Sequence, residues 1–419
     1  MSTRTSILGR AVALCMATAC VTATAADATP FKVGTFELSG REFVGLVLQD
    51  RRVVDIAPAN AAFETRNSNA RKVVAPRDMK ELIERYEVDV GPRLRELAAA
   101  NATAEPGSAA YVHAVTALKI LPPIRPAVIL NAGANYPAHA RGIIEQGARA
   151  AARNASAAGG AGPAGGGASA GGGAAPSAGG ASSGNAPTGG PAPAAGGPPA
   201  ANAARPAPQV GSAPGIWERD PSDKRPDNPY LFLKSPTVVV GANDDVVVPK
   251  GRTQIDWECE FAVVVGARAK NVSTANAAAH IFGYSIEFDV SDRGGRNDRK
   301  MGGGPDWFVQ KNHDTFGPLG PFIVPKEFLP NPMNTRHYFT LNGEIKQDAN
   351  TSQMEYNIWE MLSYASNVLT LSPGDFIALG SPSGTNIERD NPRWMRPGDV
   401  GVCVVEGVGE QRHRIVAQE

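Results

Sequence analysis

Apolar and polar positions alternate near the amino terminus of the chain. Residues 31–59, FKVGTFELSGREFVGLVLQDRRVVDIAPA, hold three alternating runs that turn-favouring residues separate at 39–40 and 50–51. The pattern predicts three short antiparallel strands. Residues 78–102 instead space their apolar side chains three and four positions apart, which predicts helical structure with one buried stripe. Together these segments predict a small α+β domain over residues 27–118.

From residue 230 onward the chain is rich in short apolar runs. They include YLFLKSPTVVVG, DDVVVP, DWECEFAVVVGA, IFGYSIEFDVS, RHYFTLNGEIKQ, GDFIALGSPSG and GDVGVCVVEGVG. Helical patterns are confined to residues 273–280 and to YNIWEMLSYASNVLT at 356–370, and two Pro-Gly-Asp turns, at 373–375 and 397–399, each precede an apolar strand. This organisation predicts a mostly-β fold with some α, a roll or barrel-like sandwich.

A low-complexity segment interrupts this second region. Before it, AVILNAG at 127–133 predicts a strand, and the residues from Pro137 predict a helix. Residues 156–214 are almost entirely Gly, Ala, Pro and Ser, which bury too little apolar surface to offset the entropy of ordering, so disorder is expected there. One interpretation is an insert within a single domain over residues 119–419. The other is a linker between two domains.

The first 26 residues have the composition of a secretory leader. Arg4 and Arg10 precede a run of small apolar residues that is too short and too weakly apolar for a stable membrane span. We therefore expect cleavage near Ala25 or Ala26 and a periplasmic or secreted protein, with a lipoprotein anchored at Cys20 as the weaker alternative. Lys plus Arg and Asp plus Glu both number 41, and no basic patch is present, so nucleic acid is not an expected partner.

Cysteine usage excludes a thiolate metal site outside the leader. Of four cysteines, Cys15 and Cys20 lie in the predicted leader, and only Cys259 and Cys403 remain. Both lie in apolar, strand-like runs, WECEF and VGVCVVEG. Export would permit a disulfide, but the pattern favours two buried free thiols.

Acidic residues gather on one predicted strand. In QIDWECEFAVVVG, side chains alternate between faces, so Glu258 and Glu260 point the same way while Trp257 and Phe261 face the opposite side. One interpretation is an edge strand whose polar face meets water. The other is a cation between the two carboxylates, to which Asp289 in YSIEFDVSDR could add a third oxygen ligand. Carboxylates without Cys or paired His favour a hard cation.

Basic residues supply further candidates. Lys234 in LFLKSP and Lys311 in WFVQKNHDTFGPLGP lie in apolar runs, where a lysine either extends to the surface or is held for a charged partner. Arg293 follows Asp289 by four residues. His139 is either a general base or a structural histidine. No Gly-x-Ser-x-Gly elbow lies outside the low-complexity segment at 156–214, and the chain has no Walker loop.

These blocks, taken in order, resemble the fumarylacetoacetate hydrolase family. The resemblance spans roughly residues 120–419 outside the insert and is carried by NAGANYPAHA, PYLFLKSPTVVVG, DWECEFAVVVGARAKNVS, GYSIEFDVSDR, QKNHDTFGPLGPFIV, LNGEIKQ, LTLSPGDFIALGSPSG and MRPGDVGVCVVEGVG. Residues 31–118 are similar to the small N-terminal domain of many members. The resemblance implies a β-roll catalytic domain, one divalent cation, a small 2-oxo acid substrate and a homodimer, with Mg²⁺ favoured and Mn²⁺ or Ca²⁺ as alternatives.

The resemblance also implies roles for individual residues. It assigns the metal to Glu258, Glu260 and Asp289, catalytic roles to His139, Lys311 and Arg293, and substrate binding to Lys234, Ser381 and Tyr136. In the family the histidine acts with a glutamate to activate water. The implied reaction is metal-dependent hydrolysis of a C–C bond in a small β-diketo acid of the acylpyruvate or fumarylacetoacetate type.

Several positions depart from the family pattern. Many members have Glu three residues after the histidine, where this chain has Gly142, and either Glu145 or Glu388 is a candidate replacement. The segment after His139, often a short lid in the family, carries the insert here, and Gly294 replaces the family's Asp after the arginine. The alternatives to hydrolysis are isomerisation or decarboxylation of an unsaturated oxo-diacid at the same site, and an exported metal-dependent binding protein with little catalysis.

Overall fold

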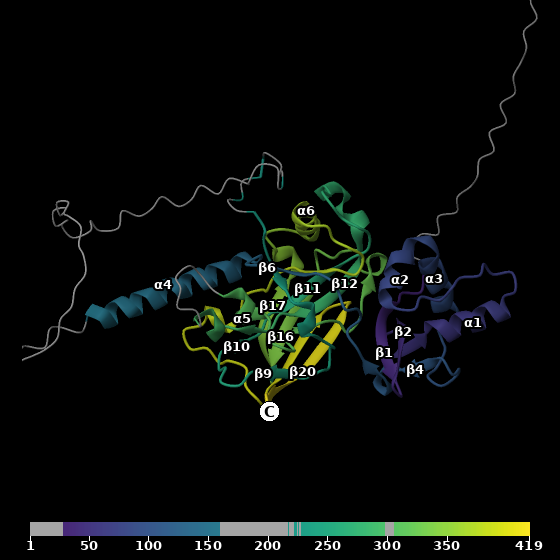
Figure 1. The fold of residues 1–419 in the computed structure, drawn as a ribbon, viewed down its shortest axis with the longest axis horizontal. Coiled ribbons are helices and arrows are strands. Elements are labelled where there is room, and N and C mark those ends of the chain that lie inside the picture. Colours follow the sequence, from purple (N-terminus) through teal and green to yellow (C-terminus); the bar gives the residue numbers. More distant parts are fainter. Residues whose placement is uncertain (1–27, 160–216, 218–221, 224, 226–227, 298–305) are drawn as a thin grey trace, which may run out of the picture.

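The computed structural model contains a small α+β region beside a larger β region (Figure 1). It describes residues 28–159, 217, 222, 223, 225, 228–297 and 306–419. The predicted leader lies outside these residues, as does the predicted insert from residue 160 to 214.

The N-terminal region is a five-stranded sheet covered by helices. The strand order is β4 (Val112–Ala114), β3 (Arg52–Asp55), β2 (Arg41–Leu48), β1 (Lys32–Leu38) and β5 (Lys119–Ile120). The helices are α1 (Ile56–Arg66), α2 (Met79–Arg85), the π-helical turn η2 (Tyr86–Val90) and α3 (Gly91–Ala100).

The three predicted antiparallel strands are confirmed, but the third ends earlier than expected. Strand β3 stops at Asp55, and residues 56–59 begin α1 instead of continuing the strand. Alanine, the strongest helix former, dominates IAPANAAFETR, and proline is tolerated in a first helical turn. The predicted helical segment at 78–102 is also confirmed, although η2 interrupts it.

Two larger sheets form the second region and confirm its mostly-β prediction. One has the order β15 (Val324–Pro325), β12 (Ile281–Phe288), β11 (Cys259–Val265), β18 (Phe376–Ala378), β6 (Ile129–Gly133) and β7 (Tyr230–Lys234). The other has the order β17 (Glu344–Asn350), β16 (Arg336–Leu341), β19 (Val400–Val405), β20 (Gly409–Ala417) and β9 (Val246–Val248). Two short pairs join β10 (Ile255–Asp256) to β13 (Ser291–Asp292) and β14 (Gly317–Pro318) to β8 (Val239–Val240).

The strands that flank the predicted insert belong to one sheet. Strands β6 and β7 pair antiparallel, with Ile129 opposite Lys234 and Gly133 opposite Tyr230. Residues on both sides of the insert therefore share one sheet, which argues against a linker between two domains. The N-terminal sheet packs against this region through a shared apolar core that includes Val33, Phe282 and Ile323.

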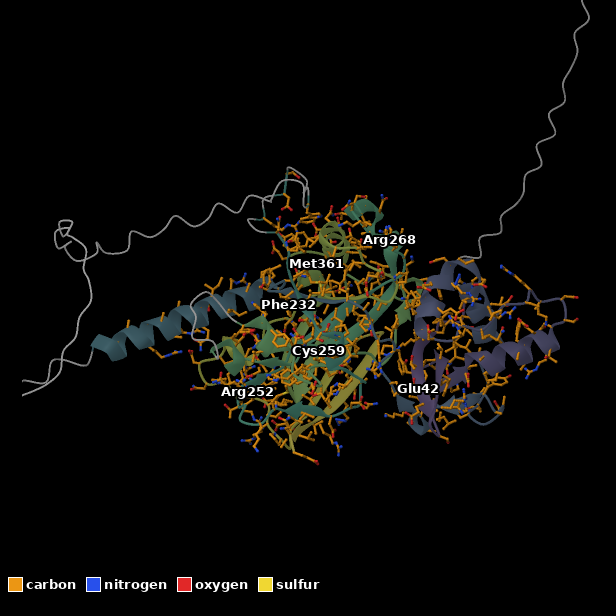
Figure 2. All side chains as sticks on the ribbon, viewed as in Figure 1. Glu42, Phe232, Arg252, Cys259, Arg268 and Met361 are labelled. Carbon is orange, nitrogen blue, oxygen red and sulfur yellow. A yellow bond between two sulfur atoms is a disulfide. The ribbon has the colours of Figure 1, made fainter. Side chains whose placement is uncertain are left out.

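A disulfide connects the two large sheets. Cys259 of β11 (labelled in Figure 2) and Cys403 of β19 form a disulfide, with 5.4 Å between their Cα atoms, and both residues are fully buried. The expectation of two free thiols was therefore wrong. The cysteines are 144 residues apart, so the local pattern could show that both are buried but not that the sheets place them face to face.

Helix α4 (Pro137–Gly159) starts at the predicted residue and extends away from the β region (Figure 1). The first four residues of the predicted disordered insert, 156–159, are thus helical. Two further helices are α5 (Trp307–Lys311), which was not predicted, and α6 (Ile358–Val368), which was. Among the described helices, none is both long and apolar enough to cross a lipid bilayer.

Candidate metal and catalytic site

Four carboxylates lie on one face of two neighbouring strands. Glu260 of β11 pairs directly with Glu287 of β12, while Glu258 precedes β11 and Asp289 follows β12. The backbone pairing continues past the strand ends, because the Asp289 N–H donates to the Glu258 carbonyl at 2.9 Å. Directly opposed residues of an antiparallel pair share a face, so the sheet itself gathers these side chains.

Glu258, Glu260 and Asp289 fit a hard cation. Each offers one carboxylate oxygen, and these three oxygens all lie within 4.8 Å of one another. All three residues are buried, with Glu260 only 1% exposed. The alternative of a solvated edge strand is therefore wrong, and a set of oxygen donors is what Mg²⁺, Mn²⁺ and Ca²⁺ prefer.

Burial and the surrounding charges shift the pKa values of the carboxylates in this cluster in opposite directions. Burial, together with the charges of Asp289, Glu258 and Glu287, raises the pKa of Glu260 well above its usual range. Burial also raises the pKa of Glu287, to about 7. Burial opposes ionisation of Glu258 too, but Arg293 and Lys311 outweigh it and hold its pKa well below normal. A bound cation would relieve the repulsion at Glu260.

Two buried lysines contact the same carboxylates. Lys311, at the end of α5, contacts Glu258 and Asp289, and Lys234, at the end of β7, contacts Asp289. Neither lysine extends to the surface, since Lys234 is 1% and Lys311 2% exposed. Burial alone would lower the pKa of Lys311, but the charges of Asp289 and Glu258 outweigh it. The pKa therefore lies above its usual value, and the ammonium stays charged. The two alternatives for these lysines were extension to the surface and a charged partner. The structure shows the second for both.

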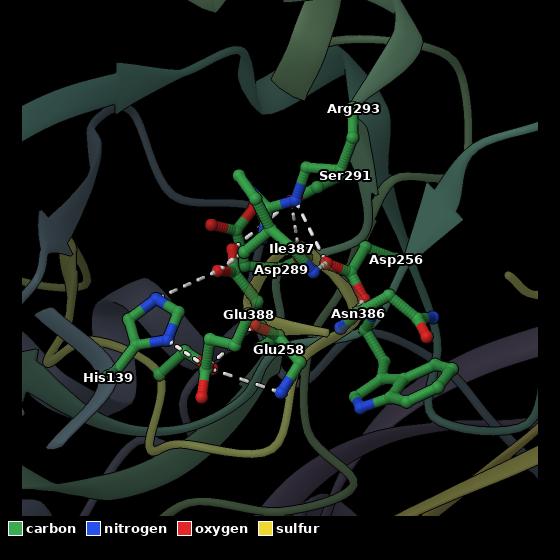
Figure 3. Close-up of polar contacts among 12 residues, drawn as sticks. His139, Asp256, Glu258, Asp289, Ser291, Arg293, Asn386, Ile387 and Glu388 are labelled. Carbon is green, nitrogen blue, oxygen red and sulfur yellow. Dashed lines mark hydrogen bonds and ion pairs between the residues drawn. The ribbon is translucent and has the colours of Figure 1, made fainter. Parts of the chain in front are cut away.

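Arg293 ties Glu258 to a second acid. Its Nη2 donates to Glu258 Oε1 at 2.6 Å and its Nε donates to Asp256 Oδ2 at 3.0 Å (Figure 3). Asp256 is fully buried and also accepts the backbone N–H groups of Asn386 and Ile387, at 2.9 and 3.2 Å. This acid fixes the guanidinium and fastens the 386–388 segment to the site.

His139, near the start of α4, lies between two glutamates. Its Nδ1 lies 2.5 Å from Glu388 Oε1, and its Nε2 lies 3.7 Å from Glu258 Oε1 (Figure 3). Glu388 belongs to the short 3₁₀ turn η9 (Asn386–Glu388). Of the two candidate partners for His139, the structure therefore places Glu388 there, whereas Glu145 is exposed and pairs with Arg149.

Glu388 is held as a carboxylate. It accepts hydrogen bonds from the hydroxyls of Ser383 and Thr385, at 2.5 and 2.8 Å, and from the Gly384 N–H at 3.1 Å. Burial opposes ionisation, but the hydrogen bonds from His139, Ser383 and Thr385 outweigh it and lower the pKa of Glu388. An ionised Glu388 accepts the Nδ1 proton of His139, which leaves Nε2 as the nitrogen free to accept a proton.

Gly142 provides the space for this pair. A Cβ atom at Gly142 would lie 2.8 Å from Glu388 Cγ and 2.9 Å from Glu388 Oε2. Real Cβ contacts are essentially never that close, so any larger residue at 142 would displace the Glu388 side chain. The glycine that breaks the family pattern on the helix is thus the residue that allows an acid from another segment to reach His139.

The two remaining sequence candidates make internal contacts. Ser381 Oγ accepts from Gln347 Nε2 at 2.8 Å, and the neighbouring Gly380 N–H donates to Glu260 Oε2 at 2.8 Å. The hydroxyl of Tyr136 bonds to His337 Nε2 at 2.8 Å. Substrate binding by Ser381 and Tyr136 stays a prediction.

Sequence reasoning missed three polar residues of the site. Glu287 was detectable, because it precedes Asp289 by two residues on the same predicted strand, as Glu258 precedes Glu260. Asp256 precedes Glu258 by two residues, so the same alternation places it on the same face. Gln347, which also accepts from the Cys259 N–H at 3.1 Å, carries no signal in a surface-like hairpin sequence.

Comparison with known proteins agrees with this geometry. Residues 200–416 match the family model described as fumarylacetoacetate (FAA) hydrolase C-terminal, which is just over half of the chain. The protein belongs to the fumarylacetoacetate hydrolase family. The predicted family is therefore confirmed, and the family's divalent metal agrees with the carboxylate set of Glu258, Glu260 and Asp289.

The chain matches different shares of the length of two curated relatives. The mitochondrial oxaloacetate tautomerase FAHD2A of Bos taurus is 36% identical over 192 residues, which is 46% of this chain and 60% of that protein. An uncharacterized protein of Pyrococcus abyssi is 36% identical over 218 residues, which is 52% of this chain and 88% of that protein. The match with the mitochondrial relatives thus spans only about 60% of their length.

Solved structures of the family share the fold across most of the chain. A probable 2-hydroxyhepta-2,4-diene-1,7-dioate isomerase from Mycobacterium abscessus has a TM-score of 0.58 at 18% identity, covering 93% of this chain and 99% of that one. A maleylpyruvate hydrolase from Sphingobium sp. SYK-6, in complex with manganese(II) and pyruvate, has a TM-score of 0.56 at 21% identity, covering 93% and 100%. At these identities the likeness establishes the fold.

Proposed function

We propose that this member of the family is a divalent-metal-dependent hydrolase that cleaves a C–C bond in a small 2-oxo acid of the acylpyruvate type. The observation that carries the proposal is the His139–Glu388 pair facing Glu258, at the edge of the carboxylate set. A buried histidine whose Nδ1 is engaged by a carboxylate is arranged as a general base through Nε2. Hydrolysis needs a general base for water, and His139 lies where it can serve as that base.

Glu258, Glu260 and Asp289 would hold the cation, which would supply Lewis-acid stabilisation for the 2-oxo carboxylate and its enolate. His139 Nε2 takes a proton from water, and the water oxygen forms a bond to the acyl carbon. The C–C bond to the pyruvyl carbon breaks, and its electron pair leaves as the enolate of pyruvate. The proton on His139 then returns to that carbon, so the products are pyruvate and a carboxylic acid.

The charged residues around the carboxylates serve this reaction in distinct ways. Lys311 and Lys234 keep positive charge at Asp289, close to where the enolate develops. Arg293, fixed between Asp256 and Glu258, presents a guanidinium that suits a substrate carboxylate. Burial of all three cations keeps their fields strong, because little water screens them.

Tautomerisation or isomerisation of an oxo-diacid is the second candidate. The relatives named oxaloacetate tautomerases, at about 36% identity, favour it. It uses the same enolate stabilisation without an attacking water. In that reaction His139 moves a proton between carbon and oxygen, and no C–C bond breaks.

Product analysis tests both candidates on the full chain with Mg²⁺ or Mn²⁺. With acetylpyruvate, the hydrolase is expected to remove the enol absorbance in a metal-dependent way and to yield pyruvate and acetate in equal amounts. With oxaloacetate, a tautomerase would exchange enol and keto forms without releasing a second product. Loss of the acetylpyruvate signal without acetate would overturn hydrolysis. Glu258→Ala is the negative control for both substrates.

Export and a homodimer are further parts of the proposal. The leader composition of residues 1–26 supports export, and a disulfide between Cys259 and Cys403 agrees with an oxidising compartment. Expression in a bacterial host followed by N-terminal sequencing of the periplasmic fraction tests the leader, with a mature terminus near residue 27 expected. Light scattering of the purified protein tests the dimer.

A further inference from the structure

A cavity of about 540 Å³ borders the catalytic residues on the side of helix α4. One wall is the α4 face that carries Ile143, Gly147 and Ala150, and the facing wall carries Ile387, Pro392 and Trp394. Sites for small molecules commonly measure about 300–1,000 Å³ and are mostly apolar. The size and the walls of this cavity therefore suit an organic ligand.

The cavity continues directly from the reactive groups. Counting from His139, the wall residues Ile143, Gly147 and Ala150 follow at positions i+4, i+8 and i+11, which place them on the same side of the helix. Arg293 also lines the cavity while it donates to Glu258. A longer chain on a molecule whose reacting carbonyl lies near His139 can thus extend along this face of the helix into the cavity.

We propose that this cavity binds the acyl chain of the substrate, and that the chain is an extended apolar group, aryl or alkyl. The inference rests on the hydrolase activity proposed above and specifies its substrate class. An acetyl group would leave most of the cavity to water, whereas a phenyl or a longer alkyl group would cover Ile143, Ile387 and Trp394. Each buried methylene contributes about 0.8 kcal/mol, so each should raise kcat/KM about fourfold.

The rival occupant is a distal carboxylate. Arg389 also lines the cavity, and its Nη2 donates only to a neutral acceptor, the Gly384 carbonyl at 3.1 Å. Among the described residues, no carboxylate lies within salt-bridge distance of Arg389. Gln146, Gln254 and Asn386 also line the cavity, but the large side chains of Ile143, Ile387 and Trp394 favour an apolar chain. A substrate series distinguishes the two.

Gly147 offers a way to fill the cavity without disturbing the fold. A Cβ atom built at Gly147 meets no atom within 4 Å, so a larger side chain has room to start. Replacing a helical glycine also favours the helix. Gly147→Phe would place a ring in the cavity, eight residues along the helix from His139. Gly147→Ala is the control for helix stability, and Ala148→Phe puts the same ring on the adjacent, exposed position.

The experiment compares acetylpyruvate, hexanoylpyruvate, benzoylpyruvate and a succinyl analogue with a distal carboxylate on the full chain with Mn²⁺. We expect the hexanoyl and benzoyl substrates to exceed acetylpyruvate in kcat/KM by at least tenfold. Gly147→Phe should raise KM for those two by at least tenfold and raise it far less for acetylpyruvate, while Ala148→Phe behaves as the wild type. Equal kcat/KM across the series, or a preference for the distal carboxylate, would overturn the inference.

A binding measurement separates this inference from the proposed reaction. Calorimetry with Mn²⁺ compares 4-phenyl-2-oxobutanoate with pyruvate, and neither compound needs to be cleaved. Tighter binding of the phenyl compound, lost in Gly147→Phe and kept in Ala148→Phe, supports the cavity even if no acylpyruvate is hydrolysed. Equal affinity for both compounds contradicts the cavity even if hydrolysis is established.

Discussion

The carboxylate cluster and the His139–Glu388 pair lie side by side but are built in different ways. Strand pairing between β11 and β12 brings Glu258, Glu260 and Asp289 together, and buried lysines neutralise part of their charge. The pair instead joins a helix to a distant loop through one short hydrogen bond. The cluster is fixed by a sheet, whereas the pair depends on two segments keeping their separation.

The two regions also differ in whether they are complete without a ligand. Burial and the neighbouring negative charges push the pKa of Glu260 upward, so the two lysines leave this carboxylate without enough positive charge. Glu388 has its acceptor sites filled by His139, Ser383 and Thr385, and its pKa moves downward. The cluster is therefore organised for an added cation, while the pair already has its proton arrangement.

Removing the central carboxylate should give the largest effect. Glu260→Gln deletes one metal ligand, and we expect Mn²⁺ affinity to collapse and kcat/KM to fall at least about 10³-fold. Stability without metal should not fall, because a buried like charge is removed. Calorimetric titration with Mn²⁺ and chemical denaturation check both statements, and Glu42→Gln on the exposed end of β2 is the control. A variant that still binds Mn²⁺ at wild-type affinity would contradict the ligand assignment.

Cutting the disulfide should weaken the sheet that carries the cluster. Replacing both Cys259 and Cys403 by Ser opens a link across 144 residues, and such links contribute about 2–5 kcal/mol to the free energy of unfolding. Urea denaturation measures the loss. Reductant should lower the unfolding midpoint of the wild type toward that of the variant and leave the midpoint of the variant unchanged. An unfolding midpoint of the wild type that reductant does not shift would show that the thiols are unpaired in the isolated protein.

Glu388→Gln attacks the other region alone. The amide keeps the shape but no longer holds the imidazole in the tautomer with a free Nε2, so kcat should fall about 10²- to 10³-fold. Mn²⁺ affinity should stay within about twofold of the wild type, because Glu388 is not among the carboxylates within reach of the cation. Glu145→Gln, the other candidate on sequence grounds, should be silent. Loss of metal binding in Glu388→Gln would mean that the two regions are not independent.

The cluster could be predicted from the sequence and the pair could not, for a physical reason. Alternation along a strand is a local property, so Glu258 and Glu260 could be assigned to one face from residues 257–261 alone. The same rule extends to Glu287 and Asp289. Glu388 is 249 residues from His139, in a short 3₁₀ turn without periodicity, so only the fold could select it over Glu145.

The disulfide failed as a prediction for a related reason. The burial of Cys259 and Cys403 follows from their apolar neighbours, and it is confirmed. Their contact depends on how β11 and β19, in two different sheets, pack face to face. Local pattern thus determines which face a residue occupies, whereas the partner across the core depends on topology.

His337 connects the two regions and should make stability depend on pH. Its Nε2 bonds to Tyr136, just before α4, and its Nδ1 lies 3.1 Å from the carbonyl of Cys259. Burial lowers the pKa of His337 from 6.5 to about 4. The unfolded chain therefore binds a proton at a higher pH than the folded chain. As the pH is lowered from 6.5 to 4, the free energy of unfolding should therefore fall by about 1.4 kcal/mol per pH unit.

Urea denaturation at pH 7.5 and pH 5 measures this dependence. Removing the histidine should remove its share of the slope, so His337→Gln should lose less stability between the two pH values than the wild type. Burial likewise lowers the pKa of His413 to about 4, and His413→Gln should behave in the same way. Identical pH dependence in the wild type and both variants would show that these histidines titrate normally in the folded protein.

The smallest change, one methyl group at Gly142, tests why the pair exists. Its Cβ would lie 2.8 Å from Glu388 Cγ, so Gly142→Ala should push the carboxylate away from His139 and lower kcat about tenfold, while Mn²⁺ affinity stays unchanged. Gly147→Ala in the same helix meets no atom within 4 Å and should keep full activity, so it controls for helix stabilisation. If Gly142→Ala is fully active, Glu388 has room to move. The geometry of the pair then depends on the Ser383 and Thr385 hydroxyls rather than on the space above the helix.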